Sequence, residues 1–213
     1  MTHTTKHDLL IFPCNGNAME ALDCLSQEYN LIGFVDDVAE KQGRHVFGFP
    51  VFDRSAFDIF ADAFVLAVPG SPVSYKIRKE IISGLKISQT RFAQVIHPSA
   101  QISKNSKIGY NVLIMAGVVI CGNAAIHDHV VILPNTVIHH DTSVGEYSLL
   151  GSGIVLTGYS SIEENCYIGS KSSISNYVTI GKMSLIGIGS NVLKTVPESS
   201  IYAGNPAKEI MRS

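Results

Sequence analysis

From Ile102 to Val192 an aliphatic residue stands at every sixth position of the chain, sixteen times without a break. The residue four places after each of these is nearly always small or β-branched. An α-helix repeats about every 3.6 residues and a strand about every two, so neither alone produces this period. The period instead predicts a solenoid in which each hexad forms one short strand and a corner, and three hexads close one triangular coil.

Such a solenoid brings residues that are eighteen positions apart into neighbouring coils, about 4.8 Å from each other. The aliphatic residues would fill its centre. Each coil would supply hydrogen-bond partners and an apolar floor for the next one, so that its stability comes from its neighbours. The period alone does not fix the hand of the coil.

The first 95 residues follow a different pattern, in which short apolar runs alternate with helical ones. Three runs are typical of buried strands and two of amphipathic helices: residues 9–12, 30–35 and 63–68, and residues 18–25 and 75–85. This alternation predicts a small, Rossmann-like parallel α/β sheet whose ligands bind at the carboxyl ends of its strands. We therefore expect an α/β domain over residues 1–95 and the solenoid over residues 96–213.

Composition argues against several classes of partner. A formal charge of −2 and the lack of a Lys/Arg cluster disfavour nucleic acid. The longest apolar run, residues 112–120, is far shorter than the roughly 18 residues that span a bilayer, and the start of the chain does not resemble a signal peptide. The four cysteines lack the spacing of a disulfide framework or a metal site. We expect a cytoplasmic protein with reduced cysteines and neither a membrane nor a nucleic-acid partner.

The hexads, the segment IHPSA (96–100) and the segment VPESSIYAGNPAKEI (196–210) resemble the hexapeptide-repeat acyltransferases. The whole chain, with PCNGNA (13–18) and GFVDD (33–37), is similar to the nucleotide-sugar acetyltransferases of the bacillosamine and perosamine N-acetyltransferase type and to the related sialic acid O-acetyltransferases. The resemblance implies a left-handed parallel β-helix and a homotrimer without metal, with acetyl-CoA in the groove between neighbouring β-helices. It also implies acetyl transfer to the amino group of a nucleotide-linked 4-amino-4,6-dideoxy sugar, in surface polysaccharide biosynthesis.

His140 and Asp141 are the strongest catalytic candidates. His140 is the third residue of its hexad, an outward position near a corner, and an imidazole there can accept a proton at neutral pH. Asp141 could hold the ring, although neighbours in a strand face opposite sides and can touch only where the backbone bends. The resemblance assigns the base and its acidic neighbour to this pair. A surface or interface histidine is the alternative for His140, and His139 is expected to face elsewhere.

Gly158 lies eighteen residues after His140 and should lie one coil above it. A glycine there would let a thioester approach the backbone, and its N–H could stabilise an oxyanion. The alternative is a glycine that a corner with positive φ requires.

The same register and the resemblance place acetyl-CoA contacts at Leu149, Ser170 and Ile188, although some relatives carry histidine in place of Leu149. Asn205 and Lys208 would border the CoA tail at the end of the solenoid. A solvated lysine is the alternative reading of Lys208.

The resemblance places the nucleotide-sugar pocket at Asn15, Gly16, Asn17, Asp36, Asp37 and Gly70. The first three follow a strand and open a helix, where backbone N–H groups favour a phosphate. The aspartates come about twenty residues later, as an acidic residue does in mononucleotide folds. An ordinary strand-end turn would also explain Gly70. Pro13 and Ala18 replace glycines, so G-x-G-x-x-G is absent and a nicotinamide dehydrogenase is not expected.

Two functional alternatives stay open. O-acetylation of a sugar hydroxyl would use the same residues, and a β-helix that only binds or scaffolds would need no catalysis. His127 and His129 also permit a zinc site of the kind that trimeric carbonic anhydrases of this fold bind between subunits, but no further suitably spaced histidine supports one.

Overall fold

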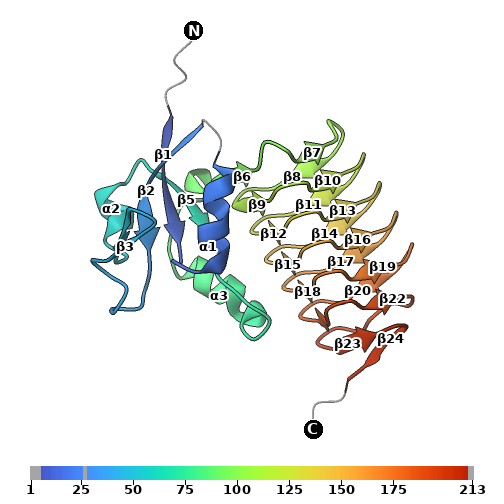
Figure 1. The fold of residues 1–213 in the computed structure, drawn as a ribbon. Helices are drawn as coiled ribbons and strands as arrows, with labels where there is room; N and C mark the ends of the chain where they lie inside the picture. Colours follow the sequence, from blue (N-terminus) through green and yellow to red (C-terminus); the bar gives the residue numbers. More distant parts are fainter. Residues whose placement is uncertain (1–5, 26–27, 211–213) are drawn as a thin grey trace.

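The computed structural model describes residues 6–25 and 28–210 and contains two parts that pack against each other (Figure 1). The N-terminal part is an α/β unit, and the C-terminal part is the predicted left-handed parallel β-helix. Residues 1–5, at the start of the chain that was compared with a signal peptide above, lie outside the described ranges. No helix in residues 6–25 and 28–210 is long and apolar enough to cross a lipid bilayer.

The N-terminal sheet has five strands in the order β3-β4-β2-β1-β5. They are β1 (His7–Phe12), β2 (Tyr29–Val35), β3 (His45–Val46), β4 (Phe49–Phe52) and β5 (Phe64–Ala67). Neighbours are parallel except at the edge, where β3 and β4 form an antiparallel hairpin. Phe47 and Gly48, the two residues of its turn, both have positive φ, as a tight hairpin turn requires. The sheet is therefore mixed, with an edge that the sequence pattern did not predict.

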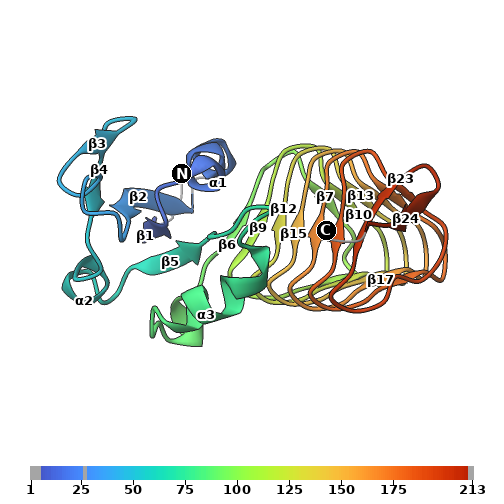
Figure 2. The ribbon, with the colours of Figure 1, turned by 90° about the horizontal axis from the view of Figure 1, so that it is seen from below.

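The helices of this part are short. They are α1 (Gly16–Glu20), α2 (Ala56–Ile59) and α3 (Arg78–Ser83), with the 3-10 turns η1 (Ala21–Cys24), η2 (Tyr75–Ile77) and η3 (Gln89–Arg91). The helix predicted over 18–25 thus divides into α1 and a 3-10 turn. Asn15 caps α1, because its side-chain Oδ1 accepts the N–H of Ala18 at 2.9 Å. Ala18 of α1 packs on the face of the sheet that carries Leu9 and Ile11, whereas Ile82 of α3 packs on the opposite face with Leu10 and Phe12. Figure 2 shows both helices near the β-helix.

The β-helix consists of three sheets, which we name by their position. The domain-facing sheet contains β6 (Gln94–Ile96), β9 (Val112–Ile114), β12 (Val131–Ile132), β15 (Leu149–Leu150), β18 (Tyr167–Ile168), β21 (Leu185–Ile186), β23 (Ile201–Gly204) and β24 (Ala207–Glu209). The second sheet contains β7 (Gln101–Ile102), β10 (Val119–Ile120), β13 (Val137–Ile138), β16 (Val155–Leu156), β19 (Ser173–Ile174) and β22 (Asn191–Val192). The third contains β8 (Lys107–Ile108), β11 (Ala125–Ile126), β14 (Ser143–Val144), β17 (Ser161–Ile162) and β20 (Thr179–Ile180).

The chain visits these sheets in turn, so each coil has three corners. We call the corner after the domain-facing sheet the first, the corner after the second sheet the second, and the corner after the third sheet the third. Strand pairing follows the predicted spacing, since Ile138 pairs with Ile120 below it and Leu156 above it, eighteen residues away in each direction.

The aliphatic residues of the hexads fill the centre of the β-helix. From Ile114 to Val192 each of them is at most 2 % exposed, and only Ile102 and Ile108 of the first coil are partly exposed. The small residues four places later are buried as well, except Ser106 of the first coil, which is partly exposed. Where they are polar, their hydroxyls donate to a corner carbonyl, as Ser148 does to Glu163 at 3.0 Å and Ser172 to Gly187 at 2.9 Å.

The two parts share one hydrophobic core along the domain-facing sheet. Leu9, Ile11 and Ala18 of the N-terminal part belong to the same buried cluster as Leu113 and Val131 of the β-helix. β6 (Gln94–Ile96), the first strand of the domain-facing sheet, straddles the boundary expected after residue 95. That domain division stays a prediction.

His129 is buried where the third corner meets the N-terminal part. Its ring stacks on Tyr147 with 4.5 Å between ring centroids and meets the edges of Phe92 and Tyr110. Its Nδ1 lies 2.8 Å from Nδ2 of Asn111. Burial, with a smaller effect of the nearby Arg78 charge, lowers the pKa of His129 to about 4.

We predict that His129 makes the fold sensitive to acid. Its pKa is near 6.5 in the unfolded chain, so between about pH 6.5 and 4 the unfolded state binds the extra proton. The free energy of unfolding should therefore fall by up to about 3 kcal/mol as the pH falls through this window. Urea denaturation across these pH values measures how steeply the free energy of unfolding falls with pH. His129→Asn should reduce this slope, because asparagine tolerates the positive φ of this position without taking up a proton. His127→Asn, at an exposed neighbour, should leave the slope unchanged, and an unaltered slope in His129→Asn would contradict the assignment.

Candidate active site

The second corner brings His140 and Asp141 together. The chain bends there because Asp141 adopts a positive φ of 56°. Side chains of neighbouring residues can then turn to the same side, and His140 Nδ1 lies 2.8 Å from Asp141 Oδ2. The His140 side chain is 53 % exposed, so its ring is accessible from outside the protomer. The bend that the sequence pattern required for this pair is therefore present.

Asp141 is held from the coils below and above. Its Oδ1 accepts Nδ2 of Asn123 at 3.3 Å, from one coil below. Hydrogen bonds from His140 first, then from Asn123 and from the Tyr159 hydroxyl one coil above, hold the pKa of Asp141 below its usual value. The carboxylate is thus ionised at neutral pH. With Nδ1 of His140 donating to it, the lone pair of the neutral ring is on Nε2, which can accept a proton from a ligand.

Gly158 supports the His140 ring from the next coil. A Cβ at this position would lie 2.7 Å from Cε1 and 2.8 Å from Nε2 of His140, so only glycine leaves room for the ring. The positive φ of this corner, 62°, falls on Tyr159 and not on Gly158, so the corner-turn explanation of the glycine is wrong. Among the described residues no group accepts a hydrogen bond from the Gly158 N–H, which leaves this donor for a ligand.

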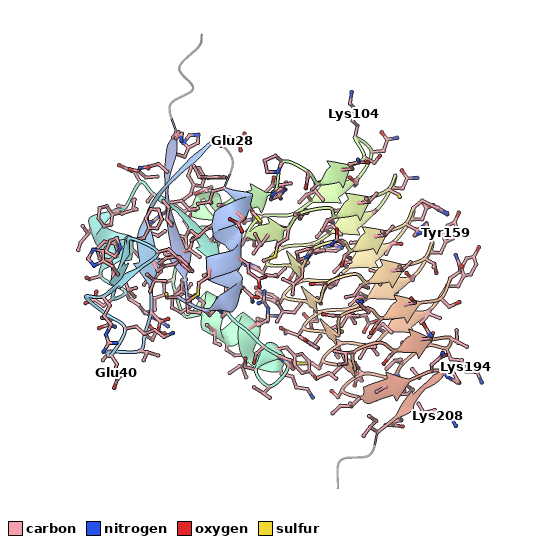
Figure 3. The ribbon with its side chains drawn as sticks, in the orientation of Figure 1. Glu28, Glu40, Lys104, Tyr159, Lys194 and Lys208 are labelled. Carbon is pink, nitrogen blue, oxygen red and sulfur yellow. The ribbon has the colours of Figure 1, made fainter. Side chains whose placement is uncertain are left out.

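Two tyrosines extend the site upward along the second corner. The ring edge of Tyr159 meets His140 with 5.2 Å between centroids and an interplanar angle of 86°, and Tyr159 stacks on Tyr177 at 5.0 Å. Figure 3 shows Tyr159 projecting from the edge of the β-helix that is farthest from the N-terminal part. Sequence reasoning missed both tyrosines, although Tyr159 comes eighteen residues after Asp141 and Tyr177 eighteen residues after Tyr159, which was a usable signal.

A second group of predicted residues lines a cavity of about 470 Å³ between the N-terminal part and the domain-facing sheet. Its lining residues are Asn15, Gly16, Asn17, Gly70, Ser71, Pro72, Ser74, Leu133, Leu149, Leu150, Gly151 and Tyr167. The structure thus brings together Leu149 and four of the six residues predicted for the nucleotide-sugar pocket. The Asn15 amide also has a structural role, since it caps α1 and donates to the Val68 carbonyl at 3.1 Å.

Asp36 and Asp37 do not line this cavity. Asp36 is buried, accepts the N–H groups of Cys14 and Val38 at 2.9 Å each, and pairs with Lys41 at 2.8 Å. Asp37 accepts two hydrogen bonds from Arg54, at 2.6 and 2.8 Å. Both carboxylates are therefore already occupied within the N-terminal part.

The remaining predicted contacts lie apart from His140 within one protomer. Ser170 and Ile188 occupy the first corner in successive coils, and Ile188 is 77 % exposed. The second sheet separates that corner from the second corner, where His140 lies. Asn205 precedes β24, and Lys208 within β24 lines a separate cavity of about 480 Å³ together with Lys194. Figure 3 shows both lysines near the C-terminal end of the β-helix.

The histidines considered for zinc occupy different environments. His127 is exposed and lies 3.3 Å from the Ser143 hydroxyl, whereas His129 is buried against Tyr147. In the part of the chain that the structure describes, no group of three or more His, Cys, Asp or Glu side chains could hold a metal ion. Cys14, Cys24, Cys121 and Cys166 are free thiols.

Comparison with known proteins supports the architecture over nearly the whole chain. Residues 92–186 match the family model described as the GMPPB C-terminal domain. A comparison with curated proteins finds no match. Among solved structures, the chain is similar to PerB from Caulobacter crescentus in complex with CoA and GDP-perosamine, with a TM-score of 0.83, 25% identity, and coverage of 96% of this chain and 97% of that one.

Two further solved structures are similar. A histidine-to-alanine mutant of GDP-perosamine N-acetyl transferase from Caulobacter crescentus gives a TM-score of 0.85 at 25% identity, covering 97% of both chains. The acetyltransferase domain of PglB from Neisseria gonorrhoeae in complex with acetyl coenzyme A gives 0.84 at 24% identity, covering 97% of this chain and 100% of that one. The combination of an α/β part and a β-helix is thus shared with these proteins from end to end.

We predict that Gly158→Ala separates His140 from Asp141. The added methyl group would displace the ring, and the Asp141 pKa should rise towards its ordinary value as the His140 hydrogen bond is lost. Carboxyl ¹³C NMR titration measures this directly. Gly122→Ala is the matched control, because it lies one coil below His140 in the same column and its Cβ would approach nothing closer than 3.6 Å. Equal Asp141 titration in the two variants would show that Gly158 does not position the ring.

Proposed function

We propose that this chain, a hexapeptide-repeat β-helix protein with the fold of the nucleotide-sugar N-acetyltransferases, transfers an acetyl group from acetyl-CoA to the amino group of a nucleotide-linked 4-amino-4,6-dideoxy sugar. The observation that carries this proposal is the His140–Asp141 pair, with an open imidazole Nε2 at a corner of the β-helix. Support comes from the enzyme solved with CoA and GDP-perosamine, whose histidine mutants were studied with the same two ligands.

In the proposed reaction the sugar nitrogen attacks the thioester carbonyl. A C–N bond forms, the C–S bond breaks, and the proton released by nitrogen passes to His140 Nε2 and then to the departing thiolate. Asp141 stabilises the imidazolium that forms meanwhile. The free N–H of Gly158 would stabilise the tetrahedral oxyanion. Because amines attack thioesters readily, the positioning of the two substrates contributes alongside the base.

A homotrimer accounts best for the distribution of the site residues. The outer face of the second sheet carries the half-buried Val119, Val137 and Val155, with Ser170 and Ile188 at one edge and His140 at the other. If three copies turn this face to a three-fold axis, the first corner of one copy lies beside the second corner of the next. Acetyl-CoA would then lie between His140 of one copy and Ser170 and Ile188 of its neighbour.

The other residues take their roles from this arrangement. Asn15, Gly16, Asn17, Gly70 and Leu149 would hold the nucleotide sugar and the adjoining end of acetyl-CoA in the cavity, and Asn205 and Lys208 would border the CoA tail. We assign Asp36 and Asp37 to shaping the strand ends beside that cavity, because both are already paired. Both substrates are intracellular metabolites, so we place the reaction in the cytoplasm, where it would serve surface polysaccharide biosynthesis.

The proposal predicts thiol release from acetyl-CoA when a nucleotide-linked 4-amino sugar is present. UDP-, GDP- and dTDP-linked amino sugars should be tested beside their hydroxyl analogues. We expect turnover with an amine, and His140→Ala should lower kcat by roughly 10²-fold or more while the oligomer stays intact, because general-base catalysis contributes on this scale.

The other candidate functions give different results in the same assay. Turnover of hydroxyl analogues alone would identify an O-acetyltransferase. No turnover, together with no thermal stabilisation by millimolar CoA, would favour a binding or scaffolding β-helix. Unchanged turnover in His140→Ala would remove His140 from the mechanism.

A mixed-oligomer experiment tests the shared site. His140→Ala and Ile188→Glu should each be nearly inactive, since one lacks the base and the other places a charge beside the proposed CoA path. When the two variants assemble together, about a quarter of the interfaces in a cyclic trimer combine an intact His140 with an intact Ile188, so activity should recover to about that fraction. If His140 and Ile188 acted within one protomer, co-assembly would restore nothing.

A further inference from the structure

Arg78 is a fully buried cation that the proposed mechanism does not use. Its side chain is 0 % exposed although it begins the short helix α3. Nε donates to the Tyr147 carbonyl at 2.7 Å, Nη2 donates to the His129 carbonyl at 2.6 Å, and Nη1 donates to the Pro69 carbonyl. Arg78 thus joins two successive third corners of the β-helix to the loop that follows β5.

No carboxylate among the described residues pairs with Arg78. Burial is the cause that lowers its pKa, to about 9, so the group still carries its charge at neutral pH. Three carbonyl dipoles accept three of its five N–H donors but do not neutralise a full positive charge. Arg78 therefore contributes positive potential to its surroundings, in a region where little solvent screens it.

Arg78 lies directly behind the wall of the cavity between the N-terminal part and the domain-facing sheet, which we call the interdomain cavity. Gly70, which lines this cavity, has a φ of 118°, and a Cβ there would lie 2.9 Å from Cδ of Arg78 and 2.9 Å from Cδ1 of Leu149. Gly70 is thus packed between the arginine and a second lining residue. The bond from Nη1 to the Pro69 carbonyl fixes the peptide that leads into Gly70.

No charged side chain of the described residues lines the cavity itself. Its lining consists of asparagines, glycines, serines and a proline from the N-terminal part, and leucines, a glycine and a tyrosine from the β-helix. A nucleoside diphosphate brings at least two negative charges into such a site. Neutral donors can hydrogen-bond to phosphate oxygens, and a nearby cation further offsets the loss of their hydration.

We propose that Arg78 is a positioning residue for the anionic part of the nucleotide sugar: from behind Gly70 its buried charge attracts the diphosphate, and its bond to Pro69 holds the wall against which the diphosphate lies. Arg78 touches no ligand in this arrangement. The inference rests on the proposed function, because it takes a nucleotide sugar as the occupant of the cavity.

A purely structural role for Arg78 leads to a different expectation. If the arginine only fixed the 69–72 loop, its loss would weaken the binding of a neutral nucleoside and of the diphosphate by the same factor. If the charge of Arg78 attracts the diphosphate, loss of Arg78 weakens the binding of the diphosphate more than the binding of the nucleoside. The ratio of the two affinities therefore separates the roles, whatever the change in stability.

The experiment measures the binding of GDP and guanosine, with UDP and uridine in parallel, to the full-length protein by calorimetry at neutral pH. The variants are then compared with the pair whose diphosphate binds the wild-type protein more tightly. Arg78→Gln keeps amide donors for the carbonyls but removes the charge, and it should reduce the preference for diphosphate over nucleoside about tenfold. Arg78→Lys keeps the charge and should retain that preference to within about threefold, even if both ligands bind more weakly.

Arg91→Gln is the matched control. Arg91 also donates to three backbone carbonyls, those of Phe57, Phe60 and Ala63, each at 3.0 Å, but it lies in the N-terminal part away from the cavity lining. Its loss should affect stability and leave the diphosphate preference unchanged.

Equal weakening of both ligands in Arg78→Gln, or loss of the preference in Arg78→Lys, would overturn the proposal. Should Arg78→Gln fail to fold, the wild-type protein provides the test: between about 0.05 and 0.5 M NaCl, attraction by a buried charge should keep the preference within about threefold. Collapse of the preference with salt, or no binding of either diphosphate, would refute the inference. Absence of acetyl transfer with an Arg78-dependent preference intact would instead refute the proposed function alone.

Discussion

The stacking of one coil on the next is the constraint on which the rest of the structure depends. From β6 to β22 the strands of the β-helix pair with residues eighteen positions away, as Ile138 does with Leu156. Buried backbone groups must find such partners, and the centre of the prism has room only for aliphatic and small side chains. The six-residue period in the sequence is the direct result of these two requirements.

The same register produces the candidate site. Successive coils place side chains in columns along each corner, so Asp141 lies between Asn123 and Tyr159, and His140 lies against Gly158. From Asn111 to Gly189 one positive-φ residue in each corner turns neighbouring side chains to a common side, which a straight strand does not allow. The chemistry therefore comes from a repetitive scaffold in which a few outward positions of adjacent coils carry polar and aromatic groups.

The period made the β-helix and the His140–Gly158 contact predictable, because it specifies which residues lie above one another. The same spacing places Tyr159 above Asp141 and Tyr177 above Tyr159, but the period does not set the conformations of outward side chains, so the parallel stack of the two rings required the structure. In the N-terminal part, spacing alone could not show that Lys41 and Arg54, which come from loops, pair with Asp36 and Asp37. Arg78 likewise belongs to an amphipathic segment whose charges are usually solvated, and only the packing of the two parts shows its burial.

The proposed reaction requires that the reacting centre lies between copies, with His140 from one and the interdomain cavity from the next. A crystal structure of the assembled protein with CoA and a nucleoside diphosphate bound would test it directly. The account predicts the CoA sulfur within about 3.5 Å of His140 Nε2, with the chain of CoA passing along the first corner of a neighbouring copy. CoA bound wholly within one protomer, with its sulfur remote from His140, would contradict it.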